Sequence, residues 1–283
     1  MREEELAVSA APAPAELREM LAEARDIVRR TRELIAAARE RGFTHGTKSD
    51  GTFVTDVDFA VEEKARALLT ARFPGHRIVG EELPETRGGC ALTWVIDPID
   101  GTRSFRHGVP LYGTLLALLH GDEPILGIID LPGLDRTYSA GKGLGARCNG
   151  RALALEDLAD GADMDGEILG IGDRQQFVNA GRAGVFDALM RAHPAVRTYT
   201  DCFGHALALE GSVGAMVDFD LRLWDTMASQ VLMEEAGGRF VCFQRDGVDW
   251  RERRFDVILG KPRVVEWILD RAGAELGAPE PRT

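Results

Sequence analysis

Residues 94–105 have the sequence Trp-Val-Ile-Asp-Pro-Ile-Asp-Gly-Thr-Arg-Ser-Phe. This stretch is the most informative part of the chain for predicting its fold and its chemistry. Asp97 and Asp100 stand three residues apart at the end of an apolar run, and Gly101-Thr102 could open a helix. Hard divalent cations such as Mg²⁺ prefer oxygen ligands of this kind, usually together with a substrate phosphate. The backbone N–H groups at a helix start offer a place for that phosphate. The stretch therefore predicts the core of a metal-dependent phosphatase.

The composition is that of a globular protein with a substantial core. The chain has 283 residues, of which 45% are hydrophobic and 28% charged. These values allow one large or two modest domains. No apolar stretch approaches the length of a membrane span, and the first residues lack the basic start and apolar middle of a signal peptide. We therefore expect a cytoplasmic protein that does not contact membranes.

Charge and cysteine usage argue against two other classes of protein. The four cysteines are far apart and form no Cys-x-x-Cys pair, which favours structural thiols over a zinc or redox centre. The formal net charge of −12 argues against nucleic-acid binding, which needs basic patches. Bound Mg²⁺ would reverse the sign of a local acidic site, so this charge does not exclude a phosphate substrate.

The hydrophobic pattern predicts alternating helices and strands, which is typical of a layered α/β fold. Apolar residues recur at helical spacing from Glu16 to about Arg41, and Gly42 is expected to end this helix. Further helices are predicted near residues 59–73, 181–192, 203–213, 225–236 and 262–272. Strands are predicted at residues 76–79, 94–96, 112–119, 124–131, 167–170, 196–199, 215–219, 239–243 and 255–259.

We expect the chain to have three parts. Residues 1–15 are rich in Ala, Pro and Glu and are predicted to be a flexible leader. Residues 16–156 are predicted to form an N-terminal α+β domain that carries the metal-binding loops, and residues 157–283 a C-terminal α/β domain. The boundary is placed at the polar, turn-rich segment 157–166.

Acidic residues recur at the ends of the predicted strands, where α/β sheets bind their ligands. They are Asp58, Glu81, Asp97, Asp100 and Asp225. Taken singly, each is better explained as an exposed carboxylate or a helix cap. That explanation does not account for both Asp97 and Asp100, because a helix cap uses only one of them. Pro98 also stiffens the segment between the two acids. We therefore interpret the acids as one site.

Other catalytic motifs are absent from the sequence. There is no Gly-x-Ser-x-Gly nucleophile elbow and no phosphate-binding Gly-x-x-x-x-Gly-Lys-Ser/Thr loop. The glycine-rich residues 141–145 lack dinucleotide-binding spacing and are predicted to form a surface β-turn. The six histidines show no metal-ligand spacing.

Three blocks of the sequence resemble the inositol monophosphatase-like family of Mg²⁺-dependent, lithium-sensitive phosphatases. They are Gly80-Glu81-Glu82, residues 94–105, and Trp224-Asp225 followed by Glu235-Ala236-Gly237-Gly238. The resemblance extends from about residue 17 to residue 273. It implies an α-β-α-β-α sandwich of the sugar-phosphatase type, usually a homodimer, that binds two or three Mg²⁺ ions.

The resemblance also implies roles for single residues. The metal ligands would be Glu81, Asp97, the carbonyl of Ile99, Asp100 and Asp225. Asp97 would bridge two ions, and Gly101 and Thr102 would hold phosphate through backbone N–H groups. Asp58, Thr102 and Glu81 would orient and deprotonate a water molecule on the metal. Two metals about 3.5–4 Å apart can clamp an in-line displacement, and phosphoryl transfer mainly requires such positioning.

The substrate is indicated by weaker features. Residues 108–119, 127–132 and 201–208 resemble the histidinol-phosphatase branch of the family, which makes histidinol phosphate the leading substrate. Asp218 resembles the position of a family acid that contacts the substrate, and it could pair with an ammonium or accept hydrogen bonds from an inositol hydroxyl. A surface role explains Asp218 equally well, and the same alternatives hold for Arg222, which could line the mouth of the site.

Two alternatives remain open at this stage. The enzyme could act on inositol-1-phosphate or on a broad range of sugar and polyol phosphates, with nucleotide 3′-phosphates and fructose bisphosphate less favoured. Some members of the family also serve as factors associated with RNA polymerase or ribosomes, so a regulatory binding protein is the alternative of another class. All the expected ligands are present in the chain, which favours catalysis.

Overall fold

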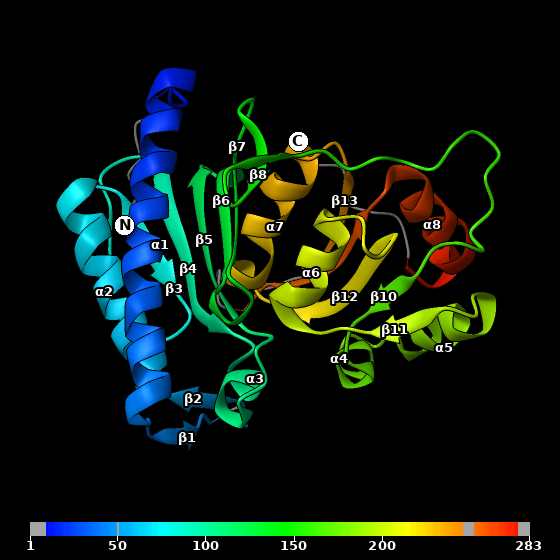
Figure 1. Cartoon of the computed structure of the whole chain (residues 1–283), viewed down its shortest axis with the longest axis horizontal. Helices are drawn as coiled ribbons and strands as arrows, with labels where there is room; N and C mark the ends of the chain where they lie inside the picture. Colours follow the sequence, from blue (N-terminus) through cyan, green and yellow to red (C-terminus); the bar gives the residue numbers. More distant parts are fainter. Residues whose placement is uncertain (1–9, 50, 246–251, 277–283) are drawn as a thin grey trace, which may run out of the picture.

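The structure of the chain is a computed structural model that describes residues 10–49, 51–245 and 252–276. Within these residues the helices and strands form five layers that alternate between helix and sheet (Figure 1). The layered α/β class and the α-β-α-β-α arrangement predicted from the sequence are therefore confirmed. None of the described helices has a segment long and apolar enough to cross a membrane.

The larger of the two main sheets is formed by strands from the N-terminal part of the chain, within residues 77–153. Its seven strands are, in spatial order, β3 (Arg77–Gly80), β4 (Leu92–Asp100), β5 (Gly113–His120), β6 (Glu123–Leu131), β7 (Arg136–Gly141), β8 (Gly145–Cys148) and β9 (Arg151–Leu153). Only β3 and β4 are parallel; the later neighbours are antiparallel. Helices α1 (Pro14–Arg41) and α2 (Asp56–Arg72) cover one face. β4 is a nearly continuous apolar run because it is covered on both faces.

The smaller sheet carries the outer helices of the C-terminal half. Its five strands are, in spatial order, β11 (Val196–Thr198), β10 (Leu169–Ile171), β12 (Ala215–Leu221), β14 (Arg254–Gly260) and β13 (Arg239–Arg245). β10 is parallel to both of its neighbours, and β14 is antiparallel to both of its own. The outer face packs against α4 (Arg174–Asn179), α5 (Ala183–Ala192) and α8 (Pro262–Leu276).

The middle layer joins the two sheets. Helices α6 (Asp201–Leu209) and α7 (Leu223–Glu235) lie between them, and one apolar core contains residues from both sheets and both helices (Figure 1). A Cβ atom at Gly127 of β6 would lie 2.4 Å from the carbonyl oxygen of Ala228. Glycine at this position therefore lets α7 approach the larger sheet closely.

The predicted division into domains follows the two sheets only in part. The boundary at residues 156 and 157 falls between β9 and β10, but α6 and α7 pack on both sheets. Whether residues 16–156 and 157–283 fold separately stays a prediction. Residues 1–9 of the predicted leader lie outside the described residues, and α1 begins at Pro14.

Several local predictions need correction. The strand predicted at residues 94–96 is longer and spans Leu92–Asp100 as β4, and β7, β8, β9 and α4 were not predicted. α6 was expected at 203–213 but spans Asp201–Leu209. The helix end at Gly42 is confirmed by its φ of 86° and its N–H bond to Ala38, and residues 141–145 do form the turn between β7 and β8. A hairpin of β1 (His45–Thr47) and β2 (Phe53–Thr55), helix α3 (Thr102–His107) and a 3₁₀ turn (Pro132–Leu134) complete the described elements.

Candidate metal and phosphate site

Three of the predicted acids converge. Asp97, Asp100 and Asp225 each offer a carboxylate oxygen, and these oxygens lie within 4.8 Å of one another. The first two residues come from the end of β4 and the third from the first turn of α7. They line a cavity of about 570 Å³ to which Glu81 and Thr102 also contribute. Acids remote in sequence therefore form one site.

An irregularity in β4 brings Asp97 and Asp100 to the same side. In a regular strand, residues three apart point to opposite faces. The pairing of β4 with β5 shifts register between these two residues, as in a β-bulge. Pro98 lies within the irregular part, where its missing N–H is tolerated. The bulge thus converts an alternating strand into a pair of convergent ligands.

Asp225 serves as a helix cap and as a member of the acid cluster. Its Oδ2 accepts a hydrogen bond of 2.7 Å from the N–H of Arg222, which closes the N-terminus of α7. The positive end of the helix dipole favours a carboxylate at this position. The capping role considered for this residue is therefore real, and it fixes the orientation of the side chain beside Asp97.

The cluster holds more negative charge than the surrounding protein neutralises. Burial, followed by the charge of Glu81, raises the pKa of Asp97 well above its usual range. Burial and Asp201 do the same for the pKa of Asp100, and burial raises the pKa of Asp225 to about 7. Within the described residues, Oδ1 of Asp97 is buried without a hydrogen-bond partner. The cluster offers only oxygen ligands, and one of these oxygens has no hydrogen-bond donor in the part of the chain that the structure describes. Such a set of closely spaced carboxylates fits Mg²⁺, which prefers oxygen ligands.

Glu81 reaches the cluster from the segment after β3 and is paired with a lysine that the sequence analysis did not single out. Lys48 Nζ lies 2.6 Å from Glu81 Oε1 and 2.7 Å from Glu82 Oε1. Burial opposes the charged form of Lys48, but the two glutamates outweigh it and raise the pKa of the lysine. Burial and Glu81 raise the pKa of Glu82 to about 7. Nothing in the sequence spacing connects Lys48 with residues 33 and 34 positions later.

Thr102 and Asp58 meet as the resemblance implied. The hydroxyl of Thr102 lies 3.3 Å from Asp58 Oδ1 and 2.9 Å from the carbonyl oxygen of Ile99, so it can donate to either. Asp58 is fully buried at N3 of α2, where Oδ2 accepts a 2.8 Å bond from the N–H of Thr55. Burial raises the pKa of Asp58 to about 6, although the bonds from Thr55 oppose the shift. The Thr-x-x-Asp spacing of a capping box was the available signal for Thr55.

Gly101 adopts a backbone conformation that other residues rarely use. Its φ is 80°, and a Cβ atom there would lie 3.0 Å from the carbonyl oxygen of Leu111. Within the described residues, no side chain caps the helix that follows. Asp100 and Thr102 are therefore not helix caps, and Gly101 and Thr102 both line the acidic cavity.

The far side of the cavity differs from the prediction for the substrate contacts. Arg222 lines the cavity as expected, but Asp218 is not among the lining residues. Asp218 is 1% exposed, and its Oδ2 lies 3.5 Å from His205 Nε2. The nearby lining acid is Asp220, two residues later. A substrate contact by Asp218 stays a prediction without support from this geometry.

Asp201 is a lining acid that the sequence analysis did not single out as a site residue. It stands at the start of α6 with φ of 59°, a region that non-glycine residues seldom occupy. Its Oδ2 accepts a 2.9 Å hydrogen bond from Thr200, and the N–H of Cys202 donates to Asp100. Burial raises the pKa of Asp201 to about 6. Its left-handed backbone depends on tertiary packing, which sequence spacing does not reveal.

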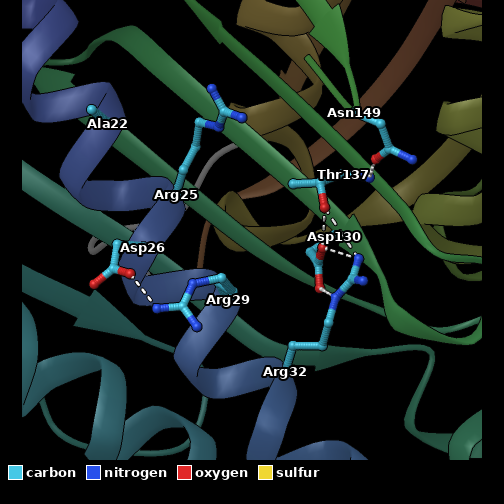
Figure 2. A pocket seen from close by; sticks show the side chains of 8 residues that line it. All are labelled: Ala22, Arg25, Asp26, Arg29, Arg32, Asp130, Thr137 and Asn149. Carbon is cyan, nitrogen blue, oxygen red and sulfur yellow. Dashed lines mark hydrogen bonds and ion pairs between the residues drawn. The ribbon is translucent and has the colours of Figure 1, made fainter. Parts of the chain in front are cut away.

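A second cavity of about 560 Å³ lies between α1 and strands β6 and β7 (Figure 2). We call it the arginine groove; its charged lining residues are Arg25, Asp26, Arg29, Arg32 and Asp130. Arg32 binds Asp130 through two bonds of 2.7 and 3.0 Å, and Arg29 pairs with Asp26 at 2.6 Å. Most of its charge is therefore neutralised within the protein. The acidic cavity is the better candidate for a functional site.

Together, the layered fold and the acidic cavity define a class of α/β protein with convergent carboxylates that fit a divalent cation. The chain matches the model of the inositol monophosphatase family over residues 16–272. It therefore belongs to the inositol monophosphatase family, and it is a phosphatase that acts on phosphate monoesters. The family resemblance inferred from the sequence is confirmed.

Individual relatives carry more than one name. The chain is 36% identical over 201 residues to a histidinol-phosphatase of Chlorobaculum parvum, which covers 71% of this chain and 76% of the relative. It is 32% identical over 239 residues to a probable inositol 1-monophosphatase of Mycobacterium tuberculosis, which covers 82% and 86%. A solved IMPase/NADP phosphatase complexed with Mg²⁺ and phosphate shares 20% identity, with a TM-score of 0.77 over 94% of this chain and 99% of that chain.

Proposed function

We propose that this protein is a Mg²⁺-dependent phosphomonoesterase and that its substrate is histidinol phosphate. The observation that carries the metal-dependent part is the convergence of Asp97, Asp100 and Asp225 within 4.8 Å. Like charges in a buried site are unfavourable unless a cation joins them. Glu81 and Ile99 line the same cavity. The carboxylate of Glu81 and the carbonyl of Ile99 would complete the ligand set for two or three ions.

Bound Mg²⁺ would supply Lewis-acid stabilisation of the phosphoryl oxygens and would lower the pKa of a coordinated water molecule. The chain's own residues would provide orientation and proton acceptors. Thr102 can donate its hydroxyl proton toward Asp58 Oδ1, at 3.3 Å, which leaves its oxygen lone pairs free to accept a hydrogen bond from the attacking water. The carboxylate of Glu81 would be the second acceptor. Gly101 and Thr102 would bind the phosphate through backbone N–H groups.

The leaving group would lie on the side of the cavity formed by the C-terminal half. Asp220 is neutralised there by Arg245 at 2.6 Å and Arg254 at 3.3 Å. Asp201 has no ion pair with any described residue, so a cationic group on the substrate would find an unpaired carboxylate. Histidinol phosphate carries an ammonium group, whereas inositol-1-phosphate does not. The relatives called histidinol-phosphatase support the same choice.

A phosphate-release assay tests this proposal. Purified protein with Mg²⁺ should hydrolyse histidinol phosphate with a higher kcat/KM than inositol-1-phosphate, adenosine 3′,5′-bisphosphate or fructose 1,6-bisphosphate. Chelation should abolish the activity, and added Mg²⁺ should restore it. A clear preference for inositol-1-phosphate would overturn the substrate and leave the metal-dependent phosphatase intact.

Inositol-1-phosphate is the second candidate substrate, because relatives with inositol monophosphatase in their names align over similar lengths. Gln176 and Asn179 also line the cavity and could bind hydroxyl groups. A regulatory role associated with RNA polymerase or ribosomes is the alternative of another class. Asp97→Asn distinguishes it, because a binding protein would keep its cellular role without turnover. The expected homodimer stays a prediction, testable by light scattering.

A further inference from the structure

Glu62 of α2 is a fully buried acid that takes no part in the proposed reaction. Its carboxylate accepts three hydrogen bonds from two different segments. Arg66 Nε donates at 2.7 Å, the N–H of Glu82 at 2.8 Å and the N–H of Leu83 at 3.2 Å. A buried carboxylate with three donors is fully engaged, and hydrogen bonds to a charged group are stronger than neutral ones. Glu62 therefore fastens α2 to the segment that follows β3.

Two neighbours extend this attachment. A Cβ atom at Gly80 would lie 2.1 Å from Glu62 Oε1, so only glycine lets the carboxylate sit directly against the chain. Arg66 donates to the hydroxyl of Thr86 at 3.0 Å and to the carbonyl of Leu83 at 3.2 Å. We call Glu62 and Arg66 the α2 clamp. It holds residues 80–86 at several points along their length.

Glu81 lies within the clamped segment and faces the acid cluster. Its N–H donates to the carbonyl of Ile96 at 3.2 Å, which leaves the side chain directed to the cavity beside Lys48. The N–H groups of Glu82 and Leu83, which directly follow Glu81, are the two that bind Glu62. These bonds therefore fix the backbone on which the Glu81 side chain is carried.

We propose that Glu62 is a positioning residue that sets the affinity of the site for divalent cations by holding Glu81 in place. The inference rests on the proposed function, in which Glu81 is a cation ligand. Residues that orient metal ligands typically change metal affinity by about 10–100-fold when they are replaced. Glu62 acts through the backbone of residues 82 and 83, so its effect should fall at the lower end of that range.

Calorimetric titration of the Glu62→Gln variant with Mg²⁺ and Mn²⁺ tests the inference. Glutamine keeps the size of the side chain but replaces one acceptor oxygen with an amide that cannot accept a backbone N–H. We expect the Kd for the cation to rise about tenfold. The Mg²⁺ concentration needed for half-maximal activity should rise by the same factor, while kcat at saturating Mg²⁺ stays within about twofold of the wild type. Glu63→Gln is the matched control, because the neighbouring Glu63 is exposed.

A folded Glu62→Gln variant with the cation affinity of the wild type would overturn the inference. If circular dichroism shows that this variant does not fold, the Thr86→Val variant is titrated in its place. Thr86 is exposed, and this change removes only the hydroxyl that binds Arg66. The expected rise in Kd is then about threefold, in line with one lost hydrogen bond, and an unchanged Kd contradicts the inference. The titration needs no substrate, so absence of phosphatase activity in the wild type would contradict the proposed function separately. A wild type that binds neither cation would remove the basis of both.

Discussion

The acidic cavity and the arginine groove are nearly equal in volume, at about 570 and 560 Å³, and both contain buried carboxylates. In the groove, Asp130 is buried but bound by Arg32 and Thr137, so its charge is matched (Figure 2). In the acidic cavity, Asp97 has an oxygen without a partner among the described residues and repels its neighbours. A buried charge that the fold neutralises contributes to structure, and a cluster of acids that it leaves unmatched is a candidate ligand site.

Asp97→Asn should produce the largest effect on catalysis. It removes a charged ligand from the centre of the cluster, so kcat on the best substrate should fall by about a thousandfold or more, since metal stabilisation is worth several kcal/mol. Asp130→Asn, the matched change in the groove, should leave kcat within about twofold. Steady-state phosphate release at saturating Mg²⁺ measures both. Equal losses in the two variants would mean that the cavities do not differ as described.

In the absence of metal, the same two substitutions should change the stability of the protein in opposite directions. Asp130→Asn breaks a buried, doubly bonded ion pair and should reduce the free energy of unfolding by about 3 kcal/mol. Asp97→Asn removes a repelled charge and should raise the metal-free midpoint of thermal unfolding. Differential scanning calorimetry with a chelator tests this. A destabilised metal-free Asp97→Asn variant would contradict the unmatched-charge interpretation.

The pH dependence of stability should also separate the two cavities. In the folded state the pKa of Asp225 is raised to about 7, above its ordinary value of 3.8. The folded protein therefore binds a proton there more tightly than the unfolded chain, which stabilises it below pH 4 and is lost as the pH rises through 7. The metal-free midpoint should fall by about 5 °C between pH 4 and pH 8. Asp225→Asn should flatten this slope, and Asp130→Asn should not; an equal slope in all three proteins would refute the assignment.

Asp201→Asn should have the smallest effect and the most selective one. The variant keeps the size of the side chain and removes the charge proposed to bind the ammonium of histidinol phosphate. KM for histidinol phosphate should rise about tenfold, which corresponds to one charge-assisted hydrogen bond. The KM for inositol-1-phosphate should stay unchanged in the same preparation. A parallel rise for both substrates would assign the residue a general structural role.

The sequence predicts the acid cluster better than it predicts the pocket around it. Asp97, Asp100 and Asp225 follow or interrupt apolar runs, so their place at the ends of core elements is visible in the pattern. The bulge that turns Asp97 and Asp100 to the same side depends on pairing with β5, which local sequence does not encode. Lys48 and Asp201 reach the cavity through tertiary contacts over long separations. Asp218 is not among the lining residues and lies 3.5 Å from His205 instead.

The dependence on tertiary contacts also explains which strands were missed in the fold predicted from the sequence. β7, β8 and β9 are short strands that alternate with turns, so their periodicity is weak, although the turn between β7 and β8 was recognised from its glycines. α1 was predicted almost to the residue because its apolar face repeats over a long helix. Long periodic elements are readable from one sequence, whereas short ones depend on their neighbours.

Crystals soaked with Mn²⁺ test the central claim most directly, because Mn²⁺ takes oxygen ligands as Mg²⁺ does and scatters anomalously. We predict anomalous peaks within coordination distance of Asp97, Asp100 and Asp225, with at least one peak that also contacts Glu81. No peak is expected in the arginine groove. The absence of any peak at the three aspartates, in crystals that show Mn²⁺ elsewhere on the molecule, would contradict the account.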